Sequence, residues 1–257
     1  MVSKTEMDKG KVRTMLQRDD IAKIIEEYDR MKLRIGMTAS HSALDICDGG
    51  IEEGFPTVAY CQEWRHNTNA NYFKTKISGA GRVLRGMVDK AIVMPSFNDV
   101  MDESMQVEMR KRNVVYIPNR SFTSYSSIED VENKFKVPLF GSRNMLRMEE
   151  RTEEQDYYWI LDKAGLPYPD AIENPEDIDC LVIVKLHHAQ KKLERGFFTC
   201  ASYQEYKEKS EVLLKDGIID QASLDGARIE RYVIGPVFNL NFFYSLCGGR
   251  VITFRVA

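Results

Sequence analysis

The sequence predicts an α/β protein in two parts, a doubly wound parallel sheet followed by an α+β region. The chain of 257 residues is long enough for one large or two modest domains. Short apolar runs alternate with helical patterns in its first half, and the pattern changes after Lys136. We therefore expect a boundary near residue 137, with domains at residues 1–137 and 138–257.

The composition excludes several classes of protein. Lys and Arg total 36 against 39 Asp and Glu, a formal net charge of −3, so no general basic field attracts nucleic acid or an anionic membrane surface. The 5 cysteines have no CxxC spacing, which is typical of reduced, buried thiols. The sequence has neither a signal-peptide core nor an apolar run of roughly 18 residues, so we expect a cytoplasmic protein.

The first half alternates between helix and strand patterns. Asp20 precedes an apolar series at helical spacing that ends at Tyr28, which predicts an N-terminal helix packed on a core. The polar segment 67–85 interrupts the alternation as an insertion. Strands are expected at 33–38, 57–61, 91–94 and 114–117, and helices at 43–53, at 99–112 and from about 127.

The second half has one helix among strands that look antiparallel, which favours an α+β region. Gly165 and the prolines of LPYP end an earlier helix. Helices are expected at 150–163 and 203–215, and strands at 181–185, 196–201, 227–234, 238–245 and 251–256.

Polar residues follow the first predicted strand, where open α/β sheets bind ligands. Free amides and hydroxyls of Ser40 and Ser42 at the start of the next helix would hold a phosphate, and His41 would add a charge-assisted hydrogen bond. The alternative is that Ser40 or Ser42 caps the helix and His41 is an ordinary loop residue.

A second polar segment, NRSFTSY at 119–125, follows the strand that ends near Ile117. Two such segments at one sheet edge form a pocket suited to a phosphorylated, polar heterocycle. The alternative is a solvated loop that caps the next helix.

In the second half, Lys185 ends an apolar strand, where it either extends along the sheet edge to solvent or reaches a nucleotide phosphate. The cationic segment 187–196 follows it, and its two adjacent histidines lack a third ligand, so no zinc site is assigned. Glu230 offers a carboxylate beside main-chain groups of the kind that bind adenine, or it is a surface residue of an edge strand.

The order and spacing of eight segments add to these observations. The segments are TASHSALDI, EEGFPTVAYC, YIPNRSFTSY, FGSRNMLRMEE, KAGLPYP, VIVKL, ARIERYVIG and NLNFFYS. Together they resemble the archaeal formate-dependent formaminoimidazole carboxamide ribonucleotide (FAICAR) synthetases of the ATP-grasp superfamily, and the resemblance covers about residue 33 to the end.

The resemblance implies an N-terminal Rossmann-like (pre-ATP-grasp) domain that binds aminoimidazole carboxamide ribonucleotide (AICAR) and a partial ATP-grasp domain. It implies a ligase of IMP biosynthesis that formylates AICAR with formate and ATP, through formyl phosphate, in the presence of Mg²⁺ or Mn²⁺. By the same resemblance, His41, Ser121, Ser40 and Ser42 would contact AICAR. The residues that would contact ATP are Lys185, Arg195, Glu230, Val233, Arg143 and Arg147.

The sequence departs from the family in two places. A cationic segment stands where a glycine-rich stretch usually follows Lys185, and no Asp or Glu occurs after Glu230, so we expect no metal ligands in this chain and a C-terminally incomplete catalytic domain. Two alternatives stay open: another ATP-grasp carboxylate–amine ligase, and a non-catalytic nucleotide-binding sensor. A homo-oligomer also stays open.

Overall fold

The chain folds into two compact units, residues 1–149 and 150–257. The computed structural model describes residues 16–149, 156–186, 197–238, 242–245 and 249–252. The division falls later than the boundary expected near residue 137. The reason is that Leu139 forms a β-bridge with Tyr116, so the chain beyond 137 still adds to the first unit.

The first unit is built on a four-stranded parallel sheet in the order β5-β2-β1-β6. From β1 the chain proceeds to β2 and β5 on one side, then crosses back to β6 on the other side of β1. The strands are β1 (Arg34–Thr38), β2 (Thr57–Gln62), β5 (Lys90–Met94) and β6 (Val114–Tyr116).

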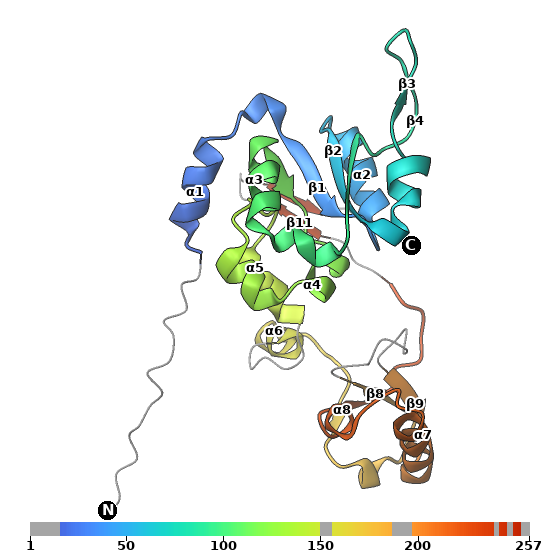
Figure 1. Cartoon of the computed structure of the whole chain (residues 1–257). Coiled ribbons are helices and arrows are strands. Elements are labelled where there is room, and N and C mark those ends of the chain that lie inside the picture. Colours follow the sequence, from blue (N-terminus) through green and yellow to red (C-terminus); the bar gives the residue numbers. More distant parts are fainter. Residues whose placement is uncertain (1–15, 150–155, 187–196, 239–241, 246–248, 253–257) are drawn as a thin grey trace, which may run out of the picture. The chain divides into compact units, whose positions relative to one another are not determined.

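Both faces of this sheet are covered. Successive residues of β2 point to opposite sides, and its buried residues enter two different cores. Val58 and Tyr60 pack on one core, and Ala59 and Cys61 on the other. Figure 1 shows helices around the sheet, and the two cores assign them to its faces. The second core contains α2 (Ala43–Glu52), whereas the first contains α3 (Glu103–Lys111), α4 (Arg120–Tyr125) and α5 (Ile128–Lys134). The doubly wound arrangement is thus confirmed.

Three parts of the first unit differ from the expectation. Helix α1 (Arg18–Glu26) buries none of its residues. Of the apolar series expected to pack on the core, only Tyr28, which follows the helix, is buried, and its hydroxyl donates to the carbonyl of Val114. The segment 119–125, expected as a loop, contains α4. The insertion 67–85 holds a π-helical turn, η3 (Asn67–Tyr72), and a hairpin of β3 (Lys76–Ile77) and β4 (Val83–Arg85), which projects from the unit in Figure 1.

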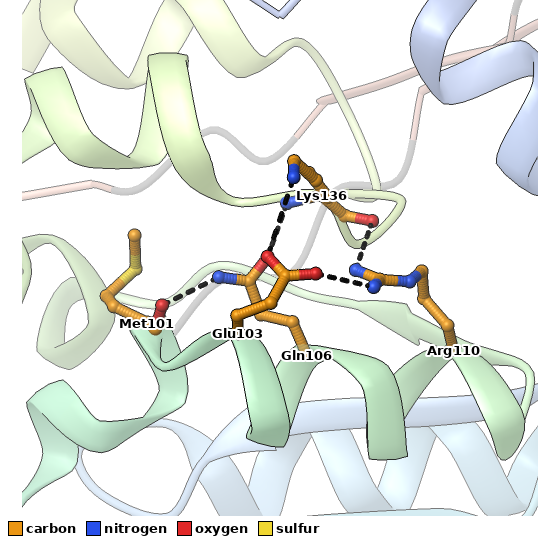
Figure 2. Close-up of polar contacts among 5 residues, drawn as sticks. All are labelled: Met101, Glu103, Gln106, Arg110 and Lys136. Atoms are coloured by element: carbon orange, nitrogen blue, oxygen red, sulfur yellow. Dashed lines mark hydrogen bonds and ion pairs between the residues drawn. The ribbon is translucent and has the colours of Figure 1, made fainter.

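Side chains of α3 fix the segment that follows α5 (Figure 2). The amide of buried Gln106 accepts from the N–H of Lys136 at 2.6 Å and donates to the carbonyl of Met101 at 2.7 Å. Arg110 pairs with Glu103 and donates to the carbonyl of Lys136. These contacts explain why the chain past residue 136 stays attached to the first unit.

The second unit contains an antiparallel sheet in the order β7-β10-β8-β9. Val182, Val184 and Ile229 lie on its buried face, where Cys200 and Ile178 complete the core. The elements are α6 (Tyr157–Lys163), β7 (Ala171–Ile172), β8 (Val182–Lys185), β9 (Phe197–Cys200), α7 (Tyr203–Lys215), α8 (Gln221–Asp225) and β10 (Arg228–Arg231).

The expected α+β pattern of the second unit is confirmed, with local differences. Strands β11 (Phe242–Ser245) and β12 (Gly249–Ile252) pair as an antiparallel hairpin. The short elements β7 and α8 were not expected. Of the helix expected at 150–163, the described part begins at Tyr157, since residues 150–155 lie outside the described ranges. Short 3₁₀ helices occupy Arg30–Lys32, Glu63–Arg65, Phe97–Met101, Arg143–Glu149 and Pro175–Asp177.

Candidate functional site

The first unit has its topological switch point between β1 and β6, because the chain leaves β1 toward β2 and returns on the opposite side. In open α/β sheets the crevice beyond the carboxyl ends of such strands binds ligands. The turn 39–42 after β1 and the segment 117–121 after β6 lie at this edge. A hydrogen bond of 2.6 Å between the buried hydroxyls of Thr38 and Tyr116 joins the two strand ends.

The turn after β1 has an unusual backbone. His41 adopts a left-handed conformation with a φ of 48°, which is uncommon for a residue other than glycine, and its side chain is exposed. Ser42 is the N-cap residue of α2, yet its side chain makes no capping hydrogen bond. The main-chain N–H groups of residues 41, 42, 44 and 45 find no acceptor among the described residues, so they are available to an anion.

Asn119 connects the two segments at the switch point. Its amide nitrogen donates to the carbonyls of Thr38 at 2.9 Å and Ser40 at 3.1 Å, and its oxygen accepts from the N–H of Phe122 as the N-cap of α4. Asn119 was not among the residues expected to contact a ligand. An Asn directly before a helix is a capping signal that predicts α4, but nothing in the sequence predicts the bonds to the other loop.

Ser121 lies one residue into α4 and is 6% exposed. Its helix is tied through Asn119 to the turn that carries Ser40 and His41. The structure therefore brings the segments of all four residues expected to contact AICAR to one edge of the first sheet. Their contacts with AICAR stay a prediction.

A second amide reaches the same turn from the β2 side. Asn69, in η3, is 6% exposed and donates to the carbonyl of Ala39 at 3.3 Å. Its side-chain oxygen is buried and has no hydrogen-bond partner within the described residues. Sequence reasoning missed this residue, because the polar stretch after β2 looked like an insertion without a role.

In the second unit, a polar cluster lies on the sheet face opposite the apolar core. Glu230 is fully buried and accepts from Lys185 at 2.6 Å and from Arg228 at 2.5 Å. Lys185 also donates to the hydroxyl of Tyr158 at 3.0 Å, and the guanidinium of Arg228 lies 3.7 Å from the centre of the Tyr158 ring. Lys185 and Arg228 are opposite each other across β8 and β10, so the register creates the cluster. Two cations against one carboxylate leave a net positive charge.

Hydrogen bonding keeps this cluster ionised. Burial by itself raises the pKa of the Glu230 carboxyl, but hydrogen bonds from Lys185, Tyr158 and Arg228 outweigh it and hold that pKa below its ordinary value. Burial lowers the pKa of Lys185, and its bonds with Glu230 and Tyr158 more than compensate, so this pKa is raised. Lys185 and Glu230 were both predicted to bind ATP, and the structure places them in contact.

Val233 follows β10 and is 71% exposed. Its main chain makes no hydrogen bond with any described residue, whereas the N–H of the preceding Tyr232 donates to Leu181. The free main-chain edge at Val233 is compatible with the predicted contact to adenine.

The two arginines expected to bind ATP from the first unit have protein partners. Arg143 donates to the carbonyls of Val131 at 2.5 Å and Val137 at 3.2 Å, and burial lowers its pKa to about 10. Arg147 makes a two-point ion pair with the buried carboxylate of Glu132, at 3.0 and 2.6 Å. Both therefore have structural roles, and their contacts with ATP stay a prediction. Arg195 and the segment 187–196 lie outside the described residues.

Within the described ranges, no group of three or more His, Cys, Asp or Glu side chains lies close enough to hold a metal ion. In the same ranges, no helix is both long and apolar enough to span a membrane.

A family model described as "Protein of unknown function (DUF1246)" matches residues 35–172, which is more than half of the chain. The chain belongs to this family. A second model, "Domain of unknown function (DUF1297)", matches residues 205–254. The DUF1246 match thus extends from β1 across the switch point into the second unit.

Curated relatives of this DUF1246 chain carry the name expected from the resemblance. Proteins of Methanopyrus kandleri and Methanocaldococcus jannaschii are 38% and 36% identical over 233 and 232 residues, 90% of this chain in both cases. Both are named 5-formaminoimidazole-4-carboxamide-1-(beta)-D-ribofuranosyl 5'-monophosphate synthetase. The chain spans 60% and 59% of their lengths.

Solved structures confirm the fold class. The IMP biosynthesis protein PurP from Thermococcus kodakaraensis matches with a TM-score of 0.52 and 23% identity, over 82% of this chain and 54% of that one. An L-amino acid ligase from Bacillus licheniformis matches with a TM-score of 0.52 and 14% identity, over 88% and 50%. At these identities the matches show a shared fold and nothing more.

Proposed function

We propose that this protein acts in IMP biosynthesis as an ATP-dependent ligase that formylates the amine of AICAR with formate and releases FAICAR, ADP and phosphate. The observation that carries the proposal is the switch point, where Asn119 ties the turn that bears His41 to the helix that bears Ser121. The printed names of the relatives at 38% and 36% identity support the same activity. In this proposal the partners are small molecules, and the protein works in the cytoplasm.

The edge of the first sheet suits a ribonucleotide monophosphate. Free N–H groups at the start of α2 supply donors for a phosphate, and the exposed residue His41 lies in the same turn. Ser121 adds a hydroxyl that has no hydrogen-bond partner among the described residues. A bound heterocycle would find in this set both donors and acceptors.

The polar face of the second sheet suits the phosphates of ATP. Lys185 and Arg228 exceed Glu230 by one positive charge, and this excess attracts a polyanion. The main chain of Val233 offers an edge for adenine. The two sites belong to separate units of the structure.

The proposed chemistry has two balanced steps. A formate oxygen attacks the γ-phosphorus of ATP, and the bond between that phosphorus and the bridging β-phosphate oxygen breaks. ADP departs with the electrons of this bond, and formyl phosphate is formed. The AICAR amine then attacks the formyl carbon, phosphate leaves with the electrons of the C–O bond, and the amine loses a proton to solvent. No enzyme nucleophile is needed, so the protein contributes charge and orientation.

The magnesium or manganese ion that the fold implies does not fit the described residues. They offer no cluster of three acidic or imidazole ligands, and the sequence contains no Asp or Glu after Glu230. The described residues therefore supply no ligand set for the metal.

Calorimetric titration with AICAR tests the first site. His41→Asn removes the imidazole and keeps a residue that tolerates the left-handed backbone, so a loss of affinity reports on the ring itself. Ser121→Ala should weaken binding by about tenfold if its hydroxyl contacts the ligand. Ser124→Ala is the matched control, because its exposed hydroxyl bonds to Arg120 within the same helix. Unchanged affinity in both site variants would contradict the assignment.

Release of ADP in the presence of AICAR and different carboxylates tests the reaction. The proposal expects ADP release that depends on formate, and acetate should not replace it. Turnover with a larger carboxylate and another amine would favour the alternative of a different ATP-grasp carboxylate–amine ligase. Binding of AICAR without any ATP binding would favour a nucleotide sensor.

A further inference from the structure

The turn after β1 combines a strained residue with carbonyls that accept hydrogen bonds from side chains. The left-handed backbone of His41 is disfavoured for an amino acid with a side chain, so surrounding contacts must maintain it. Those contacts are specific, because three consecutive carbonyls, those of Thr38, Ala39 and Ser40, each accept a hydrogen bond from a side-chain amide.

The two amides approach from opposite sides of β1. Asn69 belongs to η3, which follows β2, and Asn119 caps α4, which follows β6. These two strands are the neighbours of β1 on its two sides. The turn is therefore held by residues from both flanking connections, which are 50 positions apart in the sequence (119 − 69).

The orientation of the Asn119 amide is fixed by its other contact. Its oxygen accepts from the N–H of Phe122, whose ring packs 4.9 Å from that of Tyr116 in the buried core. The nitrogen must then face the turn, since one amide presents its two ends in opposite directions. Asn119 thus couples the turn to the rigid centre of the first unit.

Asn69 behaves unlike a residue that serves stability alone. Its nitrogen donates to Ala39, while its oxygen is buried without a hydrogen-bond partner among the described residues. An unpaired buried acceptor is destabilising. The hydrogen bond from this amide to Ala39 holds the turn in place, and this role explains why the unpaired oxygen is tolerated.

We propose that Asn69 and Asn119 are positioning residues that together hold the turn 39–42 so that its free N–H groups and His41 face the 5'-phosphate of a ribonucleotide. This inference rests on the proposed function and names two residues that act through the turn. The carbonyl of Ser40 and the free N–H of His41 belong to one peptide plane, so the hydrogen bond from Asn119 fixes the direction of that N–H just before α2.

The test compares the affinity of the full chain for AICAR and for the corresponding ribonucleoside, which lacks the phosphate. Asn119→Ser keeps a good N-cap for α4 and loses the donors to the turn. We expect AICAR affinity to fall by about tenfold, equivalent to about 1.4 kcal/mol, and nucleoside affinity to change by less than about twofold. Asn174→Ser, the same exchange at an N-cap of the second unit, should change neither.

Asn69→Ala should show the same selective loss. Because both amides hold one turn, the double variant should lose less affinity than the sum of the single losses, expressed as log Kd. Equal weakening of nucleotide and nucleoside, or strictly additive losses, would overturn the inference. AICAR binding that neither variant changes would overturn this inference and leave the proposed function standing. Absence of AICAR binding by the unaltered chain would overturn both.

Discussion

The ammonium group of Lys185 lies 2.6 Å from Oε2 of Glu230, a carboxylate with no exposed surface. Arg228 holds the other oxygen at 2.5 Å, so a single buried anion organises two cations. This arrangement makes the stability of the second unit dependent on pH.

Glu230→Gln should destabilise the second unit by about 2 kcal/mol at neutral pH, because Lys185 and Arg228 then lack their counter-charge. Urea denaturation measures this change. Glu205→Gln is the control, since its pair with Lys209 is about half exposed and contributes only about 0.3–0.5 kcal/mol. Equal effects of the two substitutions would contradict a special role for the buried carboxylate.

The pH profile follows from the signs of the two shifts. The pKa of Glu230 is lowered from 4.5, so its contribution is present above pH 4.5 and is lost as pH falls through the lower, folded value. The pKa of Lys185 is raised from 10.5, so its contribution is present below pH 10.5 and is lost at higher pH. Thermal melting should therefore show a plateau between these values, and Glu230→Gln should flatten its acid side.

Arg147→Met should destabilise the first unit by about 3 kcal/mol, since it leaves the 5% exposed Glu132 without its two-point partner. Lys134→Met, which breaks an exposed pair with Asp130, should cost less than about 0.5 kcal/mol. Thermal unfolding with calorimetric ATP titration separates the roles. Unchanged stability together with weaker ATP binding would show that Arg147 serves the nucleotide.

Gly36→Ala should destabilise the central sheet by about 2 kcal/mol. A Cβ at this position overlaps Cγ1 of buried Val114 and approaches the ring of Tyr60 to 3.3 Å. Gly49→Ala is the opposite case, because its Cβ would enter open space within α2, so it should stabilise the protein by about 0.5–1 kcal/mol. Denaturation midpoints measured on both variants should therefore move in opposite directions.

The thiols should differ in reactivity. Burial raises the pKa of Cys47 to about 12 and that of Cys61 to about 11, so few thiolates exist at neutral pH and the groups are inaccessible. Among the four thiols in the described part of the chain, Cys180 is partly exposed and should react first with iodoacetamide, as measured by mass spectrometry of its peptide. Modification of Cys47 before denaturation would show that the α2 core opens under native conditions.

Much of the fold was predictable, since apolar runs such as Thr57–Gln62 lie between helical patterns and imply a parallel sheet. Helix α4 was missed because Ser and Thr at 121–124 favour loops, although Asn119 signals a cap. The apolar periodicity before Tyr28 correctly predicted helix α1, but the prediction that this helix packs on a core was wrong. Periodicity identifies the apolar face of a helix and does not show whether another surface covers that face.

The site was predictable only in part. Residues after strand ends, such as His41, follow from a general rule on ligand binding at the carboxyl edge. The contact of Lys185 with Glu230 depends on the strand register that sets Lys185 opposite Arg228, which local patterns do not encode. The partners of Arg143 are main-chain carbonyls, and nothing in a sequence marks which carbonyls require a donor.

The left-handed φ at His41 also limits how this position can diverge. Glycine, asparagine and aspartate keep such a backbone at little cost, whereas valine, isoleucine and threonine do not. A homologue that has lost the imidazole but retains the bend should therefore carry one of the first three amino acids. Selection on backbone shape would then persist there after selection on side-chain chemistry has ended.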